Sequence, residues 1–516
     1  MRLPFNRRAV LRAAALASVV GPVPGFVRRA HAQPRGALRF GLSSYPPSIR
    51  PWENTGTAAA TVKLLIYRGL MGLDAEGNVR PELAASLDRD GDRAYVAKLK
   101  PNVKFSNGAA LTSDDVKFTF ESIMAERSTA FFRPNFLDLI ERVETPDAAT
   151  ARIVLKEPSA TLPLLLASPH APIISRASMA ANANNPAGHG PFLLGNSERG
   201  SWLDLAANPD FHRPGLPKVA SVRMVAYADE NLRVAALEAG DVDIIEYVPW
   251  QNFDSIKANP RLSIDSVDGP FMILLFNGTK APFNDRRLRQ VVGFAVNRDD
   301  IVKAAFFGKG SPLAGIPIPT SSPFFNEANS KYWRYDPDYA KKLMAEAGQA
   351  GGFSCVLLST AQYGMHKDTA EVVREGLSRI GVNVEMRLPD WATRVTMGGR
   401  GQFDVAVMGT AGDFNDPDGL NSILNGGLPP AYIRSIGIRN EAMEAALAEG
   451  RRTLDVEKRR EVYGRMERAA LEDAVIVGLA WRSQGYGMRK GVTGFRNLPG
   501  FNTFFSGITL EETALG

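Results

Sequence analysis

FDVAVMGTAGDFNDPDG, residues 403–419, joins an apolar run to a loop rich in aspartate and glycine. The run at residues 403–409 is typical of a buried strand, and the following loop carries Asp413, Asp416 and Asp418. Ligands of open α/β sheets gather outside the carboxyl ends of strands, so the position of this loop suggests a binding site. The loop could be a metal site, a turn that needs Asp and Gly, or a carboxylate that meets a cationic ligand.

Helix-like and strand-like segments alternate on both sides of this loop. A helix is predicted at residues 368–381 and a strand at 382–386, and residues 455–481 predict another helix and buried strand. A helix at residues 336–348 should have Asp336 as its cap, Pro337 at its first position and Gly348 after its end. Residues 37–42 predict a short buried strand. The fold class is therefore α/β with mixed sheets.

Residues 93–124 predict a hairpin followed by a helix. Polar and apolar residues alternate, with turns expected at Pro101 and at Asn107–Gly108. The helix should begin at Thr112, with Asp115 completing the capping pair. A second apolar helix face is expected along residues 288–296.

Residues 1–32 predict an export signal peptide that is not part of the fold. The pair Arg7–Arg8 and the following Leu11 and Arg12 resemble a twin-arginine signal, and an ordinary secretory signal is the alternative. The pattern AHA at residues 30–32 predicts cleavage before Gln33. Prolines interrupt the short apolar stretch, which is therefore not expected to span a membrane. The protein is expected in the periplasm.

The overall basic charge belongs to this leader. The chain has 61 basic and 55 acidic residues, and six of the arginines lie in residues 1–32, which carry no acid. The remainder is balanced at 55 of each, so the charge gives no reason to expect nucleic acid or an anionic membrane as a partner. Cys355 is the only cysteine. An intramolecular disulfide and a lipid anchor on an N-terminal cysteine of the mature chain are therefore excluded.

Seven segments, in the same order, resemble the periplasmic solute-binding proteins of peptide-type ABC importers, the family 5 extracellular solute-binding proteins. They span Ile66 to about Asp418. The segments are IYRGLMGLDAEGNVRPELAASLD, YVAKLKPNVKFSNGAALTSDDVKFTFESI, NPAGHGPFLL, DENLRVAALEAGDVDII, LLFNGTKAPFNDRRLRQVVGFAVNRDDIV, AKKLMAEAG and LSRIGVNVE.

The resemblance implies two lobes joined by a two-stranded hinge, with a subdomain inserted in the first lobe. Lobe I would comprise residues 36–70, 190–270 and 483–516, the inserted subdomain residues 71–189, and lobe II residues 271–482. A peptide or peptide-like solute would be enclosed between the lobes and delivered to an ABC permease in the inner membrane. A monomer is expected from this mechanism.

In peptide-binding members of the family, an aspartate of a similar loop meets the α-ammonium of the peptide, and GDFNDP places Asp413 at that position. An enclosed ammonium loses its water and needs an opposite charge, which agrees with this role. Asp416 and Asp418 are expected to be structural, because Asp and Gly suit turns. A calcium loop would need alternating acids and a late Glu, so we expect no metal.

Two departures from the family pattern put a plain dipeptide cargo in doubt. Thr410 stands where the family has Trp, and no Arg occurs near Thr360, where dipeptide-binding members meet the carboxylate. His366 or Lys367 could take over from a shifted position, or they could be solvated residues at a helix start. A longer peptide, an opine, a metal chelate or a sugar remains an alternative cargo.

Further ligand-binding candidates come from loops at strand ends, and the alternative for each is ordinary packing. They are Tyr45, Asn54, Thr55, Thr57, Tyr247 and Trp250. Trp391 is expected in the core. No metalloprotease, nucleophile-elbow, P-loop or other cofactor motif occurs, so a periplasmic enzyme is the weaker hypothesis, and we expect neither a cofactor nor catalysis.

Overall fold

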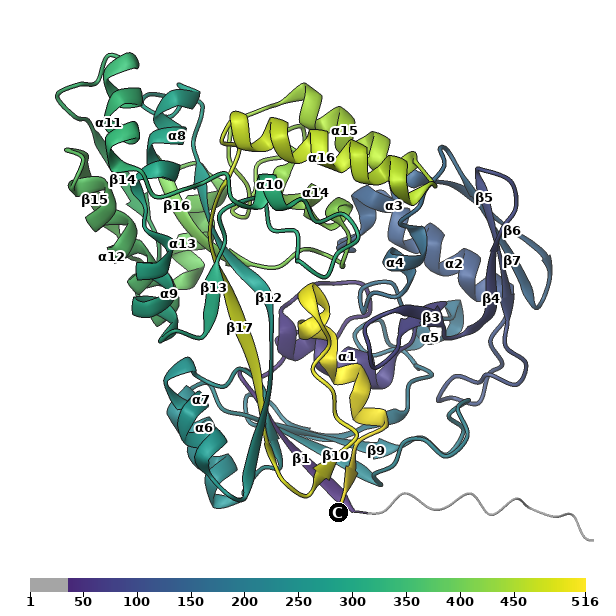
Figure 1. Ribbon diagram of the computed structural model, residues 1–516. Helices are drawn as coiled ribbons and strands as arrows, with labels where there is room; N and C mark the ends of the chain where they lie inside the picture. The colour runs from purple at the N-terminus through teal and green to yellow at the C-terminus, as the bar shows by residue number, and fades with distance from the viewer. Residues whose placement is uncertain (1–35) are drawn as a thin grey trace, which may run out of the picture. The chain divides into compact units, whose positions relative to one another are not determined.

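The computed structural model describes residues 36–516 (Figure 1). The predicted export signal and its twin-arginine pair lie outside the described residues. Within residues 36–516, no helix combines the length and the apolar character needed to cross a membrane.

One mixed sheet runs through the described chain. Its strands, in spatial order, are β15 (Asn383–Arg387), β14 (Ser354–Leu358), β16 (Val405–Thr410), β12 (Leu262–Phe276), β17 (Val477–Arg489), β11 (Ile244–Ile245), β1 (Ala37–Leu42), β10 (Ser221–Ala226), β9 (Trp202–Ala207) and β8 (Phe192–Glu198), with β13 (Gly310–Pro312) beside β17. β1 is parallel to β10 and β11, and β14 is parallel to β15 and β16, whereas β12, β16 and β17 pair antiparallel. We call the part built on β1 and β8–β11 lobe I, and the part built on β14–β16 lobe II.

The long strands β12 and β17 join the two lobes (Figure 1). Their outer halves pair Leu262 to Asp268 with Arg489 to Ser483 in lobe I. The register shifts between Asp268 and Phe271, and the other half of β12 then pairs with both β17 and β16 in lobe II. An irregularity of this kind bends and twists the ladder, which places a bend between the lobes.

Helices cover the large sheet, and a second, four-stranded sheet is formed by strands within residues 84–155. The helices of residues 57–258 are α1 (Thr57–Ile66), α2 (Ser113–Met124), α3 (Arg133–Leu139), α4 (Leu162–Leu166), α5 (Arg176–Ala181), α6 (Glu230–Ala239) and α7 (Phe253–Ala258). Those of residues 286–472 are α8 (Arg286–Ala295), α9 (Arg298–Phe306), α10 (Glu327–Ser330), α11 (Pro337–Glu346), α12 (Gly364–Ser378), α13 (Trp391–Gly399), α14 (Asn421–Leu424), α15 (Glu441–Arg452) and α16 (Val456–Glu472). The four-stranded sheet has the order β4 (Ala84–Arg89), β5 (Ala94–Leu99), β7 (Thr150–Leu155), β6 (Ile140–Asp147).

Short elements complete the fold. They are the paired strands β2 (Met71–Leu73) and β3 (Val79–Pro81), the paired strands β18 (Val492–Thr493) and β19 (Ala514–Leu515), and the 3₁₀ helices η1 (Trp250–Asn252), η2 (Pro417–Leu420) and η3 (Gly500–Glu511). The largest apolar core takes its residues from positions 271–480 and adds Phe501 of η3. Separate cores serve the region around the four-stranded sheet and the sheet of lobe I. The residue boundaries predicted for the lobes and the inserted subdomain stay a prediction.

Several local predictions are confirmed. Strand β1 has the predicted bounds, Asp336 caps α11 by accepting a hydrogen bond from the Tyr339 backbone, and Gly348 has the left-handed φ of 77°. The carboxylate of Asp115 accepts a hydrogen bond from the Thr112 backbone at 2.9 Å, as the capping pair requires.

The hairpin predicted at residues 93–108 forms only in part: the turns at Pro101 and at Asn107–Gly108 are confirmed, but β5 does not pair with the segment after Pro101. β5 pairs with β4 and β7 instead, and the following segment forms only one isolated bridge, between Lys104 and Ala110. Pro101 and Asn102, which has a φ of 62°, turn the chain directly after β5. A polar–apolar alternation predicted a strand correctly here, but it could not identify the partner strand.

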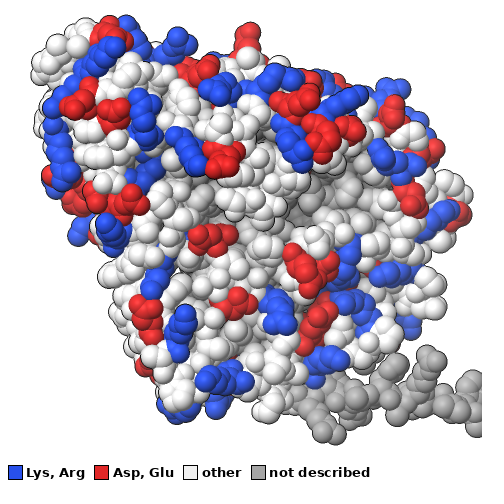
Figure 2. All heavy atoms as spheres, in the orientation of Figure 1, with Lys and Arg blue, Asp and Glu red and all other residues white. Residues whose placement is uncertain are grey.

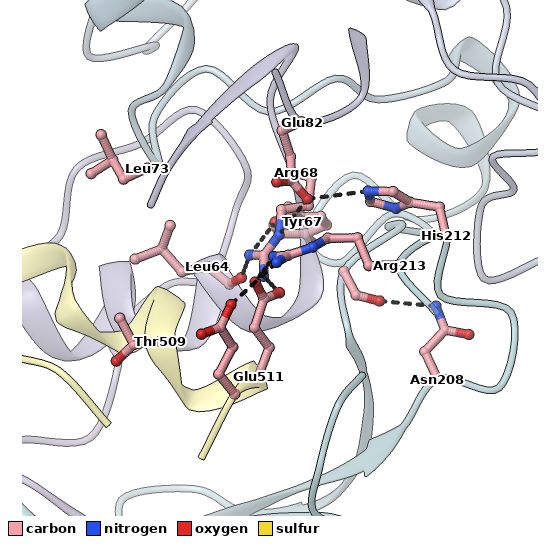
Figure 3. Close-up of polar contacts among 12 residues, drawn as sticks. Leu64, Tyr67, Arg68, Leu73, Glu82, Asn208, His212, Arg213, Thr509 and Glu511 are labelled. Carbon is pink, nitrogen blue, oxygen red and sulfur yellow. Dashed lines mark hydrogen bonds and ion pairs between the residues drawn. The ribbon is translucent and has the colours of Figure 1, made fainter. Parts of the chain in front are cut away.

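A buried ion network ties the start of the inserted region to the C-terminal segment (Figure 3). Arg68 lies 3.3 Å from Glu82 and 2.6 Å from Glu511 of η3, and all three side chains are almost fully buried. Arg80 also pairs with Glu82, and His212 Nε2 lies 3.2 Å from a Glu82 oxygen. Burial alone would raise the pKa of Glu82. The hydrogen bond with His212 and the charges of Arg68 and Arg80 outweigh burial and hold that pKa well below its usual range.

We predict that this network makes the protein less stable in acid. A carboxyl whose folded-state pKa is depressed stabilises the fold above its unfolded pKa, here 4.5, and loses that contribution as pH falls further. Urea unfolding should therefore show a smaller stability difference between wild type and Glu82→Gln at pH 3 than at pH 7. At pH 7 the variant should lose about 3–5 kcal/mol, because one partner of a buried pair is removed.

Glu385→Gln is the matched control, since Glu385 pairs with Arg387 at an exposed position. It should leave the urea midpoint nearly unchanged at both pH values. Equal effects of the two substitutions at pH 7 would contradict a stabilising role for the network.

Candidate functional site

Two of the three aspartates in the acidic loop are bound by arginines. The Asp416 carboxylate accepts hydrogen bonds from Arg459 at 2.9 Å and from the Tyr463 hydroxyl at 3.2 Å. The Asp418 carboxylate accepts from Arg451 at 2.9 Å and from the Thr161 hydroxyl at 2.9 Å. Both aspartates are buried, and no cluster of three potential metal ligands occurs within residues 36–516. These two carboxylates therefore hold the loop in place.

Asp413 has a different environment, directly after the end of β16. It forms no ion pair within 4 Å inside the described chain, and its carboxylate lies near Ser422 and Arg434. Burial raises the pKa of Asp413 to about 7, against the opposing effects of the Ser422 hydrogen bond and the charge of Arg434. The adjacent Gly412 packs on the ring of Phe501, which leaves no room for a side chain at that position.

A second cluster gathers residues of both lobes around β17. The hydroxyls of Thr57, at the start of α1, and Tyr247, after β11, lie 3.3 Å apart. The Tyr247 ring stacks on Phe504 of η3 at 5.8 Å, and both rings are partly exposed. Arg482 of β17 lies with its guanidinium carbon 5.9 Å from the Phe504 ring centre, and its Nη1 lies 3.0 Å from the sulfur of Met365 in α12.

Lobe II contributes an aromatic group next to this cluster. The rings of Tyr363 and His366 each contact Trp391, at 5.5 Å in both cases, and Trp391 also meets Tyr432. Trp391 is partly buried and packs against the edge of the lobe II core, so it is a peripheral part of the core rather than a fully buried one. The Arg394 guanidinium lies 5.4 Å from the Trp391 ring. These side chains form an aromatic group whose His366 lies near the charges of Arg394 and Arg482.

His366 is buried, which rules out the solvated alternative for this residue. Burial, together with the charges of Arg394 and Arg482, lowers the pKa of His366 to about 3. His366 is therefore neutral at physiological pH and can serve a ligand as a hydrogen-bonding group, but not as a cation. Lys367 is exposed.

Three arginines of lobe II and β17 face this region without an acidic partner. Within residues 36–516, no carboxylate lies within 4 Å of Arg394, Arg434 or Arg482. The Nε atoms of all three, and Nη1 of Arg434, are buried and have no hydrogen-bond acceptor among the described residues. Sequence reasoning missed these arginines and Phe504, because none belongs to a local motif; the available signal was an arginine inside the apolar strand at residues 477–489.

The other predicted binding residues take up separate positions. Trp250 donates its indole N–H to the Ser483 carbonyl at 2.8 Å and packs on Phe306, so it connects the lobes. The Thr55 hydroxyl donates to Ser48, Asn54 is exposed and accepts from the Gly56 backbone, and the Thr410 hydroxyl lies 3.3 Å from the Ala411 carbonyl. Tyr45 lines a cavity of about 390 Å³ with Arg199 and Leu203. Thr57 and Tyr247 are the predicted pair whose side chains meet.

A model of the family described as bacterial extracellular solute-binding proteins, family 5 Middle, matches residues 78–429, more than half of the chain. The glutathione-binding protein GsiB of Pectobacterium atrosepticum is 27% identical over 476 residues, which cover 89% of this chain and 91% of GsiB. GsiB of Escherichia coli K12 is 25% identical over 479 residues, with coverages of 90% and 92%.

Solved structures of binding proteins also resemble this chain over nearly its whole length. The binding protein AgaA of A. tumefaciens R10, in complex with agropinic acid, has a TM-score of 0.86 at 37% identity and covers 93% of this chain and 99% of its own. The periplasmic binding protein DppA of Helicobacter pylori, in complex with the peptide STSA, has a TM-score of 0.82 at 21% identity, with coverages of 93% and 98%. These two-lobed proteins confirm the predicted fold class. The chain belongs to family 5 of the bacterial extracellular solute-binding proteins, the receptors that capture peptides or related solutes for ABC importers.

Proposed function

We propose that the chain is an exported, monomeric periplasmic receptor that encloses a small peptide or an amino-acid derivative between its lobes. It passes the solute unchanged to an inner-membrane permease and needs no cofactor. One observation supports this most directly: polar side chains from both lobes meet around β17, and several of them have no partner inside the described chain. Such groups are costly to bury unless a ligand completes their hydrogen bonds.

Capture would work by shifting the lobes toward the closed state. A solute that contacts Thr57 and Tyr247 of lobe I together with Asp413 of lobe II gains its full binding energy only when the lobes are together. Closing contacts are present in the structure: the Thr161 hydroxyl donates to Asp418, and Asn415 donates its amide N–H to the Pro499 carbonyl. The acidic loop therefore takes part in both ligand contact and lobe contact.

Two kinds of cargo are supported by the relatives. The glutathione-binding relatives favour a short peptide with unusual linkages, and AgaA in complex with agropinic acid favours an opine. Thr410 and the missing arginine near Thr360 argue against a plain dipeptide. A metal chelate or a sugar has no specific observation in its favour.

Native mass spectrometry of the purified protein, before and after unfolding and refolding, tests the receptor function. The native sample should carry a small molecule that the refolded sample lacks, and its mass should be unchanged after incubation with excess protein. Release of a chemically altered product would instead support the enzyme hypothesis. A sample that binds none of its periplasmic solutes would contradict the receptor function.

We predict that Asp413 binds an ammonium group of the cargo. Asp413→Asn keeps the size of the side chain and removes its charge, so at pH 8 it should weaken binding of the co-purifying solute about a hundred-fold or more, as loss of one partner of an enclosed pair does. Isothermal titration calorimetry measures this. Asp299→Asn, at an exposed position in the first turn of α9, is the charge-matched control and should bind as wild type.

The raised pKa of Asp413 predicts a pH dependence of binding. The carboxyl must be ionised to attract an ammonium, so the affinity should fall as the pH drops below 7, the value to which the pKa of Asp413 is raised. It should also fall at alkaline pH, where the ammonium of the cargo loses its proton. The limiting slope is about ten-fold per pH unit. The groups facing this carboxyl are Asp418, Arg434 and Ser422. A wild-type profile as flat as that of Asp413→Asn would exclude the ammonium contact.

A further inference from the structure

Two buried arginines at the interlobe site have neither an acid nor a carbonyl partner for the guanidinium within residues 36–516. Arg434 is 8% exposed and Arg482 is 3% exposed, and neither guanidinium has a carboxylate partner in residues 36–516. Removing a charge from water without a partner is strongly unfavourable. An unpaired arginine inside a fold therefore indicates a place where an anion from outside completes the interaction.

Other buried arginines show how the chain satisfies such groups elsewhere. Arg459 pairs with Asp416, and Arg68 lies between Glu82 and Glu511. Arg298 has no acid, but all of its guanidinium nitrogens donate to backbone carbonyls, including those of Leu313 and Trp333. The guanidinium groups of these arginines have partners inside the chain, so we interpret these arginines as stabilising the fold. Arg434 donates no side-chain hydrogen bond in the described chain, and the one side-chain hydrogen bond of Arg482 there goes to a methionine sulfur.

The surroundings of Arg482 fit a carboxylate. The Tyr247 and Phe504 rings lie beside its guanidinium, and the Tyr247 hydroxyl can donate to an anion while it accepts from Thr57. Burial raises the pKa of Tyr247 and lowers the pKa of His366 to about 3, so both of these neighbours are neutral at pH 7. No acid of the described chain competes for the guanidinium.

Arg434 and Asp413 form a different arrangement. Each affects the pKa of the other, yet they do not approach within 4 Å as an ion pair. Two opposite charges held apart in a partly dehydrated site match an α-amino-acid head group, whose ammonium would face Asp413 and whose carboxylate would face Arg434. Arg394 donates to the Val407 carbonyl at 2.7 Å and to the Tyr432 carbonyl at 3.2 Å, so part of its guanidinium is already bonded to the backbone.

We propose that the interlobe site is built for a small solute with an α-amino-acid head group and a second carboxylate. The head group binds between Asp413 and Arg434, and the second carboxylate binds the Arg482 guanidinium and the Tyr247 hydroxyl. This inference rests on the proposed receptor function and narrows its cargo to acidic amino-acid derivatives. A peptide whose only carboxylate is its C-terminus would leave one of the two arginines, Arg434 or Arg482, unpaired.

Isothermal titration calorimetry at pH 8 with pairs of solutes tests the inference. Each pair consists of an acid, either glutathione or γ-glutamylglycine, and the same molecule with its glycine carboxylate converted to an amide. We expect at least one acid to bind about a hundred-fold more tightly than its amide. Binding of an amide as tight as its acid, or no binding of either acid, overturns the inference. If neutral or basic peptides bind instead, the receptor function stands and only this narrowing of the cargo fails.

Substitutions of Arg434 and Arg482 test the roles of the two arginines separately. Arg482→Met should weaken binding of the acid about a hundred-fold and change binding of the amide less than about three-fold, because the amide has no second carboxylate. Arg482→Lys should recover part of the affinity. Arg434→Met should weaken acid and amide alike, since both keep the head group. Lys303→Met, at an exposed position of α9, is the control for loss of a positive charge and should bind as wild type. Equal loss of the acid and the amide in Arg482→Met would contradict the assigned contact.

Stability without solute distinguishes a binding role from a structural one. Arg434→Met and Arg482→Met remove an unpaired buried charge, so their melting temperatures should equal or exceed that of wild type. Arg459→Met leaves Asp416 without its partner and should melt several degrees lower. Differential scanning calorimetry of solute-free protein measures this. A drop for Arg434→Met or Arg482→Met as large as that for Arg459→Met would make these arginines structural and overturn the assignment.

Discussion

The pairing of Asp416 with Arg459 and of Asp418 with Arg451 is the constraint on which the site depends. A loop with three aspartates would normally be held apart by like charges and turned toward water. Here two carboxylates are buried against arginines of α15 and α16, so their charges hold the loop on lobe II. Once they are fixed, Asp413 is left without an arginine ion pair after the end of β16, which is the position proposed for ligand contact. The motif thus combines two structural aspartates with one that remains available.

The same loop connects ligand contact to lobe contact. Asp418 accepts a hydrogen bond from Thr161, which precedes α4, and Gly412 packs on Phe501 of the C-terminal segment. Phe501 also belongs to the core of lobe II and stacks on Trp481, one residue before Arg482. If a solute binds Asp413 and Arg482 as proposed, it would act on the residues that hold the lobes together, and no separate signalling path between binding and closure would be needed.

Helices, strands and their caps could be predicted because they depend on residues close together in the sequence. The partners of buried charged side chains could not, because they come from segments far apart in the sequence. The caps at Thr112 and Asp336 could be predicted because a cap and its helix lie within four residues. Asp413 could be proposed from the family resemblance of its loop. Arg434 and Arg482 could not, because an arginine in a sequence does not show whether an acid or a carbonyl from a distant segment reaches it. The wrong strand pairing predicted within residues 93–108 has the same cause: β5 pairs with β4 and β7, which are distant in sequence or not recognisable as partners from the local pattern.

The interlobe site has an excess of arginines over acids, whereas the surface carries both signs of charge side by side. Acidic and basic side chains are interspersed over the face shown in Figure 2, with no extended area of one sign. The interlobe site instead has three arginines without acidic partners, against one aspartate whose pKa is raised by burial. A simple cation would meet Asp413 and leave the arginines uncompensated. A zwitterion with one additional negative charge would pair with Asp413, Arg434 and Arg482 together. Burying these three charged groups without partners is unfavourable in the ligand-free protein, and the ligand would relieve that cost when it binds.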